Sequence, residues 1–248
     1  MTGKAAIALR VGAWALLLAF LLAPQAFAPL FAPLNANGAA PIYDQGDLLP
    51  LAVAHALTAI VAAAASALVA VTLGVFVTRP GGAPFLPLSR TLVNVGQTFP
   101  PVAVLAIAVP LVGFGQWPTL IALFAYGLLP IFENTLAGID GCPKPVLEAA
   151  DGMGMSPRQR LFGVELPLAL PLIFEGVRLS LVINVGTATI GSTVAAKSLG
   201  EVIIAGLLSG NTAFVLQGGL LTGLMAVLLY DTTRLAERRL LRRHGSLC

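Results

Sequence analysis

The sequence predicts an all-α fold, a polytopic transmembrane helical bundle with about six spans. Hydrophobic residues make up 57% of the 248 residues and charged residues only 10%, and the mean hydropathy is +0.91. These values lie far from those of soluble domains. Long stretches also lack Asp, Glu, Lys and Arg, and arginines gather at their ends, as they do beside membrane spans.

The same composition limits what else the chain contains. Because one helical span takes about 20 residues, there is room for about five to seven spans with short loops and none for a separate soluble domain. The formal net charge of +3 comes from arginines at span ends, so it indicates orientation in the membrane and not affinity for nucleic acid. Cys142 and Cys248 fall in segments expected in the cytoplasm, and no disulfide framework is predicted.

The first predicted span covers the uncharged stretch Val11–Leu34, which follows Lys4 and Arg10. A basic start, an apolar core and the Ala26-Phe27-Ala28 pattern also resemble a cleaved signal peptide. The apolar run is longer than a typical signal core, which favours a retained span. The segment Pro33–Asp47 then lacks lysine and arginine and suits the outer face.

The second predicted span, Leu48–Thr78, contains no charged residue and is long enough to cross the membrane with some tilt. His55 lies near its outer end, and we expect a hydrogen-bonded packing residue there, not a proton relay. An inner loop at 79–90, rich in turn signals, follows. The third predicted span runs from about Leu92 to Val112, and its prolines at 100, 101 and 110 must kink or end it.

The fourth predicted span follows the uncharged turn 113–118 and ends near Leu136. The fifth, about Leu168–Val194, carries Glu175 and Arg178 three residues apart on one helical face. A charge at the middle of the membrane costs about 2.5–3.5 kcal/mol on insertion scales. We therefore expect these two side chains to form an ion pair near the cytoplasmic end.

A short outer re-entrant or interfacial helix is predicted within Lys197–Asn211, and a sixth span at Ala213–Thr233. Of the 14 lysines and arginines, all but Arg178 and Lys197 fall on the cytoplasmic side of this topology. This bias places both termini and the loop Asp140–Glu165 in the cytoplasm. The chain is thus predicted to divide into three parts. They are an N-terminal span with an outer segment (1–47), a core with a cytoplasmic loop at 140–167 (48–240), and a cytoplasmic tail (241–248).

The cytoplasmic loop is polar, and its residues predict two short helices joined by a tight bend. Pro145 suits a first helical position, and four apolar residues recur at helical spacing to form one stripe. Gly154 can adopt the left-handed conformation that ends a helix. Ser156, Pro157 and Gln159 form the pattern of a capping box for the next helix. The four stripe residues are Val146, Ala149, Ala150 and Met153.

The spacing in this loop resembles a known family motif. Glu148-Ala149-Ala150 is followed by three residues and Gly154, then by nine residues, Val164, one residue and Leu166-Pro167. This is similar to the EAA loop of permease subunits in binding-protein-dependent ABC importers, with Val164 at the usual isoleucine. The resemblance implies a type I ABC importer permease fold, in which the loop is the coupling helix that docks on a cytoplasmic ATPase. It implies ATPase-coupling roles for Glu148, Ala149, Ala150, Asp151 and Gly154. An ordinary cytoplasmic hairpin is the alternative.

The motifs of an enzyme are missing from the sequence. There is no Gly-x-x-x-x-Gly-Lys-Ser/Thr phosphate loop, so ATP hydrolysis is expected on a partner subunit. With only His55 and His244, neither a metal cluster nor a Ser/His/Asp set is predicted. We expect no catalytic residue, no metal ligand and no cofactor in this chain.

The resemblance to this family covers roughly Leu48 to Leu240. Further short sequence matches within this range narrow the family to one branch. They are similar to permeases for osmoprotectants such as glycine betaine, choline and carnitine. One departure is Lys197-Ser198, where such permeases often have a glycine pair. The short matches are Gln97-Thr98-Phe99-Pro100, the stretch Ile121–Ile131, Asn134-Thr135, the stretch Gly186–Ile190 and the stretch Leu199–Ile203.

The resemblance implies a set of partners in a bacterial plasma (inner) membrane. These are cytoplasmic ABC ATPase subunits, an extracytoplasmic solute-binding protein, a second permease subunit (the same or homologous) and the lipid bilayer, with no nucleic acid. The polar residues of the third to fifth spans are the candidates for lining the substrate path. They are Gln97, Thr98, Asn134, Asn184, Thr187 and Thr189.

Substrate specificity is expected mainly in the solute-binding protein. Aromatic cages usually hold quaternary ammonium groups, and the chain has only two Trp and three Tyr. A rival interpretation within the same class is an importer of an amino acid or another small polar solute. A stand-alone secondary transporter or channel, and a membrane scaffold that transports nothing, are rival interpretations from different classes.

Overall fold

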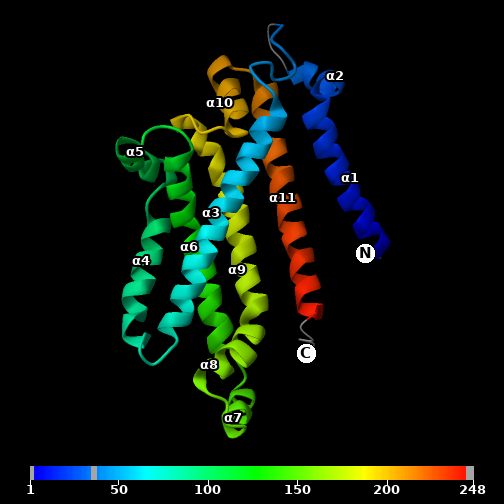
Figure 1. The fold of residues 1–248 in the computed structure, drawn as a ribbon. Coiled ribbons are helices and arrows are strands. Elements are labelled where there is room, and N and C mark those ends of the chain that lie inside the picture. The colour runs from blue at the N-terminus through cyan, green and yellow to red at the C-terminus, as the bar shows by residue number, and fades with distance from the viewer. Residues whose placement is uncertain (1–2, 35–37, 244–248) are drawn as a thin grey trace. The chain divides into compact units, whose positions relative to one another are not determined.

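The computed structural model describes residues 3–34 and 38–243, and within these ranges every regular element is a helix (Figure 1). Four helical stretches are long and apolar enough to cross a membrane, and two further pairs of shorter helices reach that length when each pair is taken together. The prediction of an all-helical polytopic bundle is confirmed. The four long stretches are Leu48–Val77, Gln116–Asp140, Pro157–Val194 and Thr212–Arg239.

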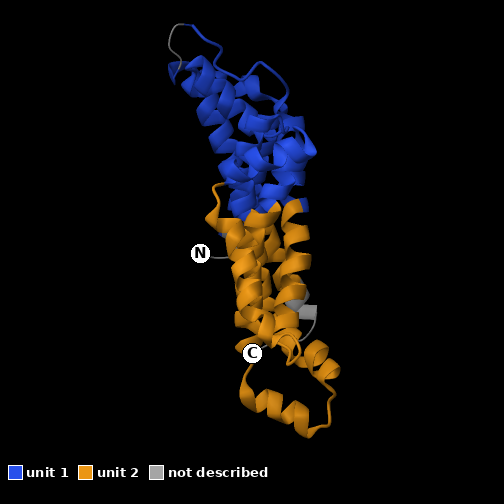
Figure 2. Ribbon diagram, turned by 90° about the vertical axis from the view of Figure 1, so that its left-hand side faces the viewer, with its two compact units in different colours: residues 1–61, 101–123, 182–229 blue, residues 62–100, 124–181, 230–248 orange. Residues whose placement is uncertain are grey.

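The chain forms two compact units, each assembled from three separate stretches (Figure 2). Unit 1 comprises Met1–Val61, Pro101–Leu123 and Val182–Leu229. Unit 2 comprises Ala62–Pro100, Phe124–Leu181 and Tyr230–Cys248.

The N-terminal segment is bent, so the first predicted span, Val11–Leu34, is divided into two helical parts. Helix α1, Gly3–Leu22, ends before Pro24 because the residue that precedes a proline is pushed out of the helical region. Ala23 accordingly has a φ of −136°. The short helices η1 (Pro24–Phe27), α2 (Ala28–Phe31) and η2 (Ala32–Leu34) follow at an angle of 109° to α1. The Phe20 ring packs edge-on against Phe27 and stacks on Phe31 across this bend.

Helix α3, Leu48–Val77, matches the second predicted span. The third predicted span, Leu92–Val112, is divided at Pro100, as its prolines predicted. Its first part belongs to α4, which begins earlier and covers Leu86–Thr98 after the short helix η3 (Ala83–Phe85). Phe99 is extended (φ −84°, ψ 133°) because prolines follow it, and α5 begins anew at Pro101 and ends at Val112. Pro110 is accommodated inside α5.

The remaining elements follow the predicted order with small shifts. Helix α6 is Gln116–Asp140, and the loop that is predicted to be cytoplasmic contains α7 (Lys144–Gly152), α8 (Pro157–Arg160) and the single π-helical turn η4 (Leu161–Glu165). Helix α9 covers Leu166–Thr187 and passes into the 3-10 helix η5, Ala188–Val194. The short helix predicted within Lys197–Asn211 is α10, Gly200–Ser209. Helix α11, Thr212–Arg243, extends beyond the predicted sixth span, and residues 244–248 of the predicted tail lie outside the described ranges.

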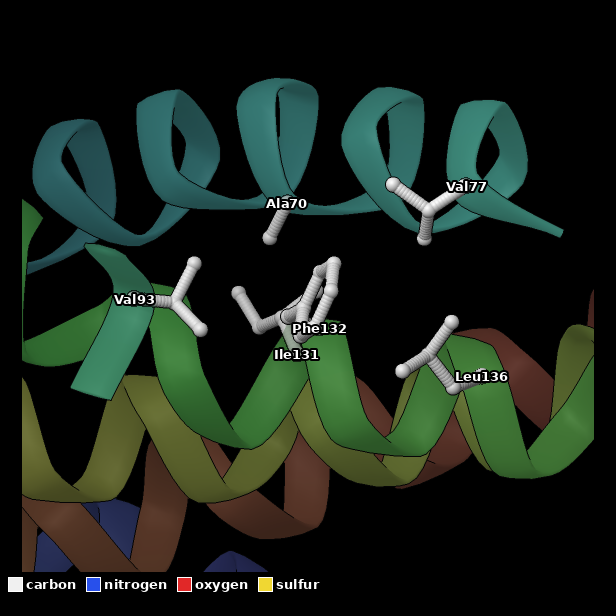
Figure 3. Packing of buried hydrophobic residues seen from close by; sticks show 6 residues of the cluster. All are labelled: Ala70, Val77, Val93, Ile131, Phe132 and Leu136. Carbon is white, nitrogen blue, oxygen red and sulfur yellow. The ribbon is translucent and has the colours of Figure 1, made fainter. Parts of the chain in front are cut away.

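The core of unit 2 lies where α3 faces α6. Ala70 and Val77 of α3 point toward Phe132 and Leu136 of α6, and Val93 of α4 packs beside them (Figure 3). Phe132 is fully buried. Glycine permits equally close contact between α4 and α6, since a Cβ on Gly96 would lie 2.2 Å from the backbone oxygen of Ala125.

In unit 1, polar side chains tie the helices together. The backbone N–H of Leu199 donates to Nδ1 of His55, so Nε2 carries the proton and donates to the carbonyl of Val185 at 2.8 Å. The expectation of a hydrogen-bonded packing histidine is confirmed. Gln217 of α11 is also fully buried, and its amide accepts from the N–H of Tyr43 and donates to the carbonyl of Pro41.

The close contact at Gly96 yields a test of the packing in unit 2. We expect Gly96→Val to destabilise the protein by roughly 1–3 kcal/mol or more, because the new side chain overlaps backbone that cannot move aside. The thermal midpoint of the detergent-solubilised protein measures this loss. Gly12→Val is the matched control, since apart from the neighbouring backbone of its own helix no atom lies within 4 Å of a Cβ at Gly12. Equal midpoints for the two variants would contradict the close packing of α4 on α6.

Candidate functional site

The bend between α7 and α8 is built by backbone hydrogen bonds around Gly154. This residue has a φ of +74°, its N–H donates to the carbonyl of Asp151 at 2.9 Å, and the N–H of Met155 donates to the carbonyl of Ala150 at 3.2 Å. This pair of bonds is a Schellman motif, which ends a helix at a left-handed residue. The predicted role of Gly154 as the helix terminator is confirmed.

The start of α8 is held by the predicted capping box. The N–H of Gln159 donates to Oγ of Ser156 at 3.4 Å, and the N–H of Ser156 donates to Oε1 of Gln159 at 2.8 Å. Pro157 occupies the first turn of α8. Helix α7 begins at Lys144, one residue before the predicted start. Both boundaries of the bend are therefore set by local chemistry.

The apolar residues of α7 do not form a buried stripe. Of the four residues at helical spacing, only Ala150 is buried, whereas Val146 and Met153 are 42% and 71% exposed. Ala149 and the carboxylate-bearing Glu148 are exposed as well. Phe162, one turn beyond α8, is 69% exposed. The loop thus exposes large apolar side chains as well as the acidic Glu148, and exposed apolar side chains are typical of an interaction site. We call this exposed set the docking surface, and its members are Val146, Glu148, Ala149, Met153 and Phe162.

A chain of charges runs from α7 to the end of α3. The carboxylate of Asp151 accepts two hydrogen bonds from Nη1 of Arg160, at 2.7 and 2.8 Å. Nε of Arg160 donates to Oε1 of Glu165 at 2.9 Å. Glu165 is buried, and its other oxygen lies 2.5 Å from Nη2 of Arg79, just beyond α3. Of these four residues the sequence reasoning singled out only Asp151. Glu165 stands at the unspecified position between Val164 and Leu166 of the loop pattern, which offered no signal.

Cys142, at the end of α6, adds a further contact to Glu165. Its thiol lies 3.7 Å from the backbone oxygen of Glu165 and 3.6 Å from that of Gly138, and it is buried. Burial raises the pKa of the Cys142 thiol, and the nearby Glu165 carboxylate raises it further.

The candidate path residues of unit 2 already have partners. The amide nitrogen of Gln97 donates to the backbone oxygen of Tyr126 at 3.1 Å, and that of Asn134 donates to the carbonyl of Pro130 at 2.8 Å. The hydroxyl of Thr98 donates to the carbonyl of Asn94. Gln97 joins α4 to α6, while Asn134 and Thr98 bond within their own helices. The structure therefore does not bring these three side chains together as a ligand site.

The candidate path residues of unit 1 lie on consecutive turns at the end of α9 and in η5. Asn184 is fully buried, and Thr187 and Thr189 are half-buried. The Thr189 hydroxyl donates to the carbonyl of Gly186 at 2.8 Å.

The predicted ion pair between Glu175 and Arg178 is confirmed, and the sequence reasoning missed its second acid. Arg178 is buried and also pairs with Glu237 of α11. The ring of Tyr230 lies 5.7 Å from the Arg178 guanidinium carbon. Glu237 is 59 residues away in sequence and sits among arginines, so its spacing gave no hint of this partner.

The described part of the chain has no group of three or more His, Cys, Asp or Glu side chains that could hold a metal ion. Its exposed charges outside the loop include the ion pair between Arg90 of α4 and Glu133 of α6, at 2.8 Å.

Comparison with known proteins gives consistent results. Residues 70–243 match the family described as binding-protein-dependent transport system inner membrane component. The chain is 38% identical over 196 residues to the osmoprotectant import permease protein OsmY of Salmonella typhimurium, covering 79% of this chain and 83% of that protein. It is 37% identical to the choline transport system permease protein OpuBB of Bacillus subtilis, covering 79% and 89%. It is 34% identical to the glycine betaine/carnitine/choline transport system permease protein OpuCB of the same organism, covering 83% and 91%.

Among solved structures, the inward-facing MetNI methionine ABC transporter has a similar chain. The TM-score is 0.66 at 23% identity, and the match covers 79% of this chain and 96% of that chain. The likeness confirms the predicted type I importer permease fold.

The environment of Cys142 leads to a labelling test. Because its pKa is raised, Cys142 carries less thiolate near neutral pH than an ordinary cysteine, and the thiolate is the reactive form. In a Cys248→Ala background, we expect maleimide labelling of the folded protein to stay slow at neutral pH and to rise as the pH approaches the raised pKa. Unfolding in detergent should restore an ordinary rate. Equal rates before and after unfolding would contradict the buried thiol.

Proposed function

Because the chain belongs to the family of binding-protein-dependent transport system inner membrane components, we propose that it forms the solute path of an ATP-driven importer for an osmoprotectant such as glycine betaine or choline. The observation that carries this proposal is the docking surface on the bent helices α7 and α8. It exposes Met153 and Phe162, which no neighbouring part of the described chain covers.

Docking on a separate ATPase explains this surface best. Apolar side chains left in water cost free energy unless a partner covers them. Glu148, exposed on the same helix α7, supplies a charge that can orient such a partner. The coupling roles of Glu148, Ala149, Ala150, Asp151 and Gly154 follow from this assignment. Ala150 acts from within, since it is buried and its carbonyl accepts the N–H of Met155 in the bend.

Transport then requires partners that this chain does not supply. A cytoplasmic pair of ABC ATPases binds the loop at 140–167 and hydrolyses ATP, since the sequence has no phosphate loop of its own. A solute-binding protein delivers the substrate from outside, and a second permease subunit completes the path. Differential affinity of the ATPases for two states of the permease drives the switch between them.

The substrate assignment rests on the relatives, whose names include osmoprotectants, choline, carnitine and glycine betaine. The polar residues of the two units offer few free groups for tight binding, since Gln97, Thr98 and Asn134 bond to backbone oxygens. A path that makes only weak contacts with its substrate is consistent with selection of the substrate by a separate solute-binding protein. Asn184, Thr187 and Thr189 are the proposed polar lining in unit 1.

The proposed topology places both termini and the 140–167 loop in the cytoplasm of a bacterial cell, with the multi-pass core in the inner membrane. The arginine-rich end of α11, from Arg234 onward, supports this orientation. In the proposed division, residues 1–47 precede the permease core at 48–240, and residues 241–248 form the tail. The start of α3 at Leu48 suits the first boundary.

Reconstitution tests the function as a whole. Vesicles that contain this permease with the ATPase and solute-binding protein encoded beside it should take up radiolabelled glycine betaine or choline only when ATP is present inside. Unlabelled carnitine should compete, and methionine should not. If only an amino acid competed, the proposed osmoprotectant substrate would be replaced by an amino acid. Uptake without the ATPase would indicate a stand-alone transporter.

The bend itself can be tested separately. Gly154→Val places a β-branched side chain at a φ of +74°, which costs about 1–2 kcal/mol and disfavours the turn between α7 and α8. We expect uptake to fall strongly while the amount of protein in the membrane stays unchanged. Gly152→Val is the matched control, because Gly152 has an ordinary φ and open space around it. Wild-type uptake by the Gly154 variant would count against the coupling role.

A further inference from the structure

Glu165 occupies an unusual place in unit 2. It is the last residue of the π-helical turn η4, directly between the cytoplasmic loop and the membrane helix α9. Its side chain is only 3% exposed. Single π-turns are rare and recur at functional sites, and a buried carboxylate must be paired to remain charged.

Two arginines from different elements pair with this one carboxylate. Arg160 of α8 approaches one oxygen at 2.9 Å, and Arg79, two residues after α3, approaches the other at 2.5 Å. Each oxygen of Glu165 is therefore committed to a different segment of the chain. The thiol of Cys142 meets the backbone oxygen of the same residue, so the end of α6 reaches this point as well.

The network continues outward to α7. Nη1 of Arg160 donates to both carboxylate oxygens of Asp151, at 2.8 and 2.7 Å, and such charge-assisted hydrogen bonds are roughly twice as strong as neutral ones. Asp151 lies one residue from Ala150, the buried contact of α7. A displacement of α7 therefore reaches Arg79 through three consecutive ion pairs.

Helix α3 is the element that needs such a link. The loop is joined covalently to α6 at one end and to α9 at the other, so its movement reaches both directly. The end of α3 is separated from the loop by all of η3, α4, α5 and α6 along the chain. In unit 2, α3 also carries one side of the core, through Ala70 and Val77.

We propose that the Arg79–Glu165–Arg160–Asp151 network is a mechanical joint that passes movement of the coupling loop to α3, which makes Arg79, Glu165 and Arg160 positioning residues for transport. This proposal rests on the proposed function, since it assigns the origin of the movement to the ATPase. The competing explanation is a static clamp that only stabilises the fold.

The test uses the assembled transporter with its ATPase and solute-binding protein in lipid vesicles. The variants are Arg79→Gln, Arg79→Lys, Glu165→Gln and Asp151→Asn. Arg90→Gln is the matched control, because it breaks another arginine–carboxylate pair of unit 2, Arg90–Glu133 at 2.8 Å, which is not part of the Arg79–Glu165–Arg160–Asp151 network. Four quantities are measured: the amount of assembled complex, its thermal midpoint, ATP hydrolysis with and without the solute-binding protein, and uptake per ATP.

A joint predicts uncoupling. Arg79→Gln should lower uptake and the stimulation of ATP hydrolysis by the solute-binding protein by about tenfold, within the usual range of coupling between sites. Unstimulated hydrolysis and the amount of complex should stay close to wild type. Arg79→Lys, which keeps the charge, should recover part of the stimulation, and Arg90→Gln should behave as wild type.

A static clamp predicts that uptake falls only in proportion to the complex that assembles, and this result would overturn the proposal. If Arg79→Gln or Glu165→Gln fails to assemble, Asp151→Asn decides. Its carboxylate is about half exposed, so its loss leaves no unpaired acid in the interior, and normal uptake per ATP in this variant would reject the joint. Failure of the proposed function is recognised separately, because the wild-type complex would then show no ATP-driven uptake at all.

Discussion

Hydrocarbon offers no partner for a polar group, and most of this structure follows from that constraint. A polar side chain buried in the protein is stabilised when it finds a partner there. His55 satisfies both ring nitrogens with backbone groups of Val185 and Leu199. The side-chain amide of Gln217 forms hydrogen bonds with Tyr43 and Pro41 in the segment before α3. The hydroxyl of Ser66 donates to carbonyls of its own helix and of α6. These hydrogen bonds determine which helices pack together, because contact between apolar helix surfaces contributes little free energy in lipid.

The same constraint explains where the helices break. Prolines remove a donor and restrict the preceding residue, and the two interruptions among the shorter helices stand at Pro24 and at Pro100-Pro101. Pro110, Pro130 and Pro171 lie inside helices that continue. A proline thus ends a helix here only where the residue before it leaves the helical region, as Ala23 and Phe99 do.

Local signals made the loop the most predictable part of the sequence. Gly154 and the Ser156 capping box concern hydrogen bonds within a few residues, so the bend was found without knowledge of the fold. The break in the third span was predicted from its prolines. The bend in the first span was not, because uncharged composition measures only whether a segment tolerates lipid, and not whether its helix is continuous. The partners of Arg178 and Glu165 depend on side chains that are distant in sequence, such as Glu237 and Arg79. The periodicity of the sequence does not indicate such pairs. For the same reason, it does not indicate which side chains line a solute path.

Helix α11 is longer than the membrane it crosses. Its 32 residues extend about 48 Å, against about 30 Å of hydrocarbon. Near the C-terminal end of α11, Glu237 forms an ion pair with Arg178 of α9. Helix α11 therefore cannot slide along its axis without separating two buried charges. Its depth in the bilayer is thereby pinned to that of α9. A thicker or thinner bilayer must then be accommodated by tilting of α9 and α11 together or by deformation of the bilayer. The bilayer thickness therefore does not shift one of these helices along the other.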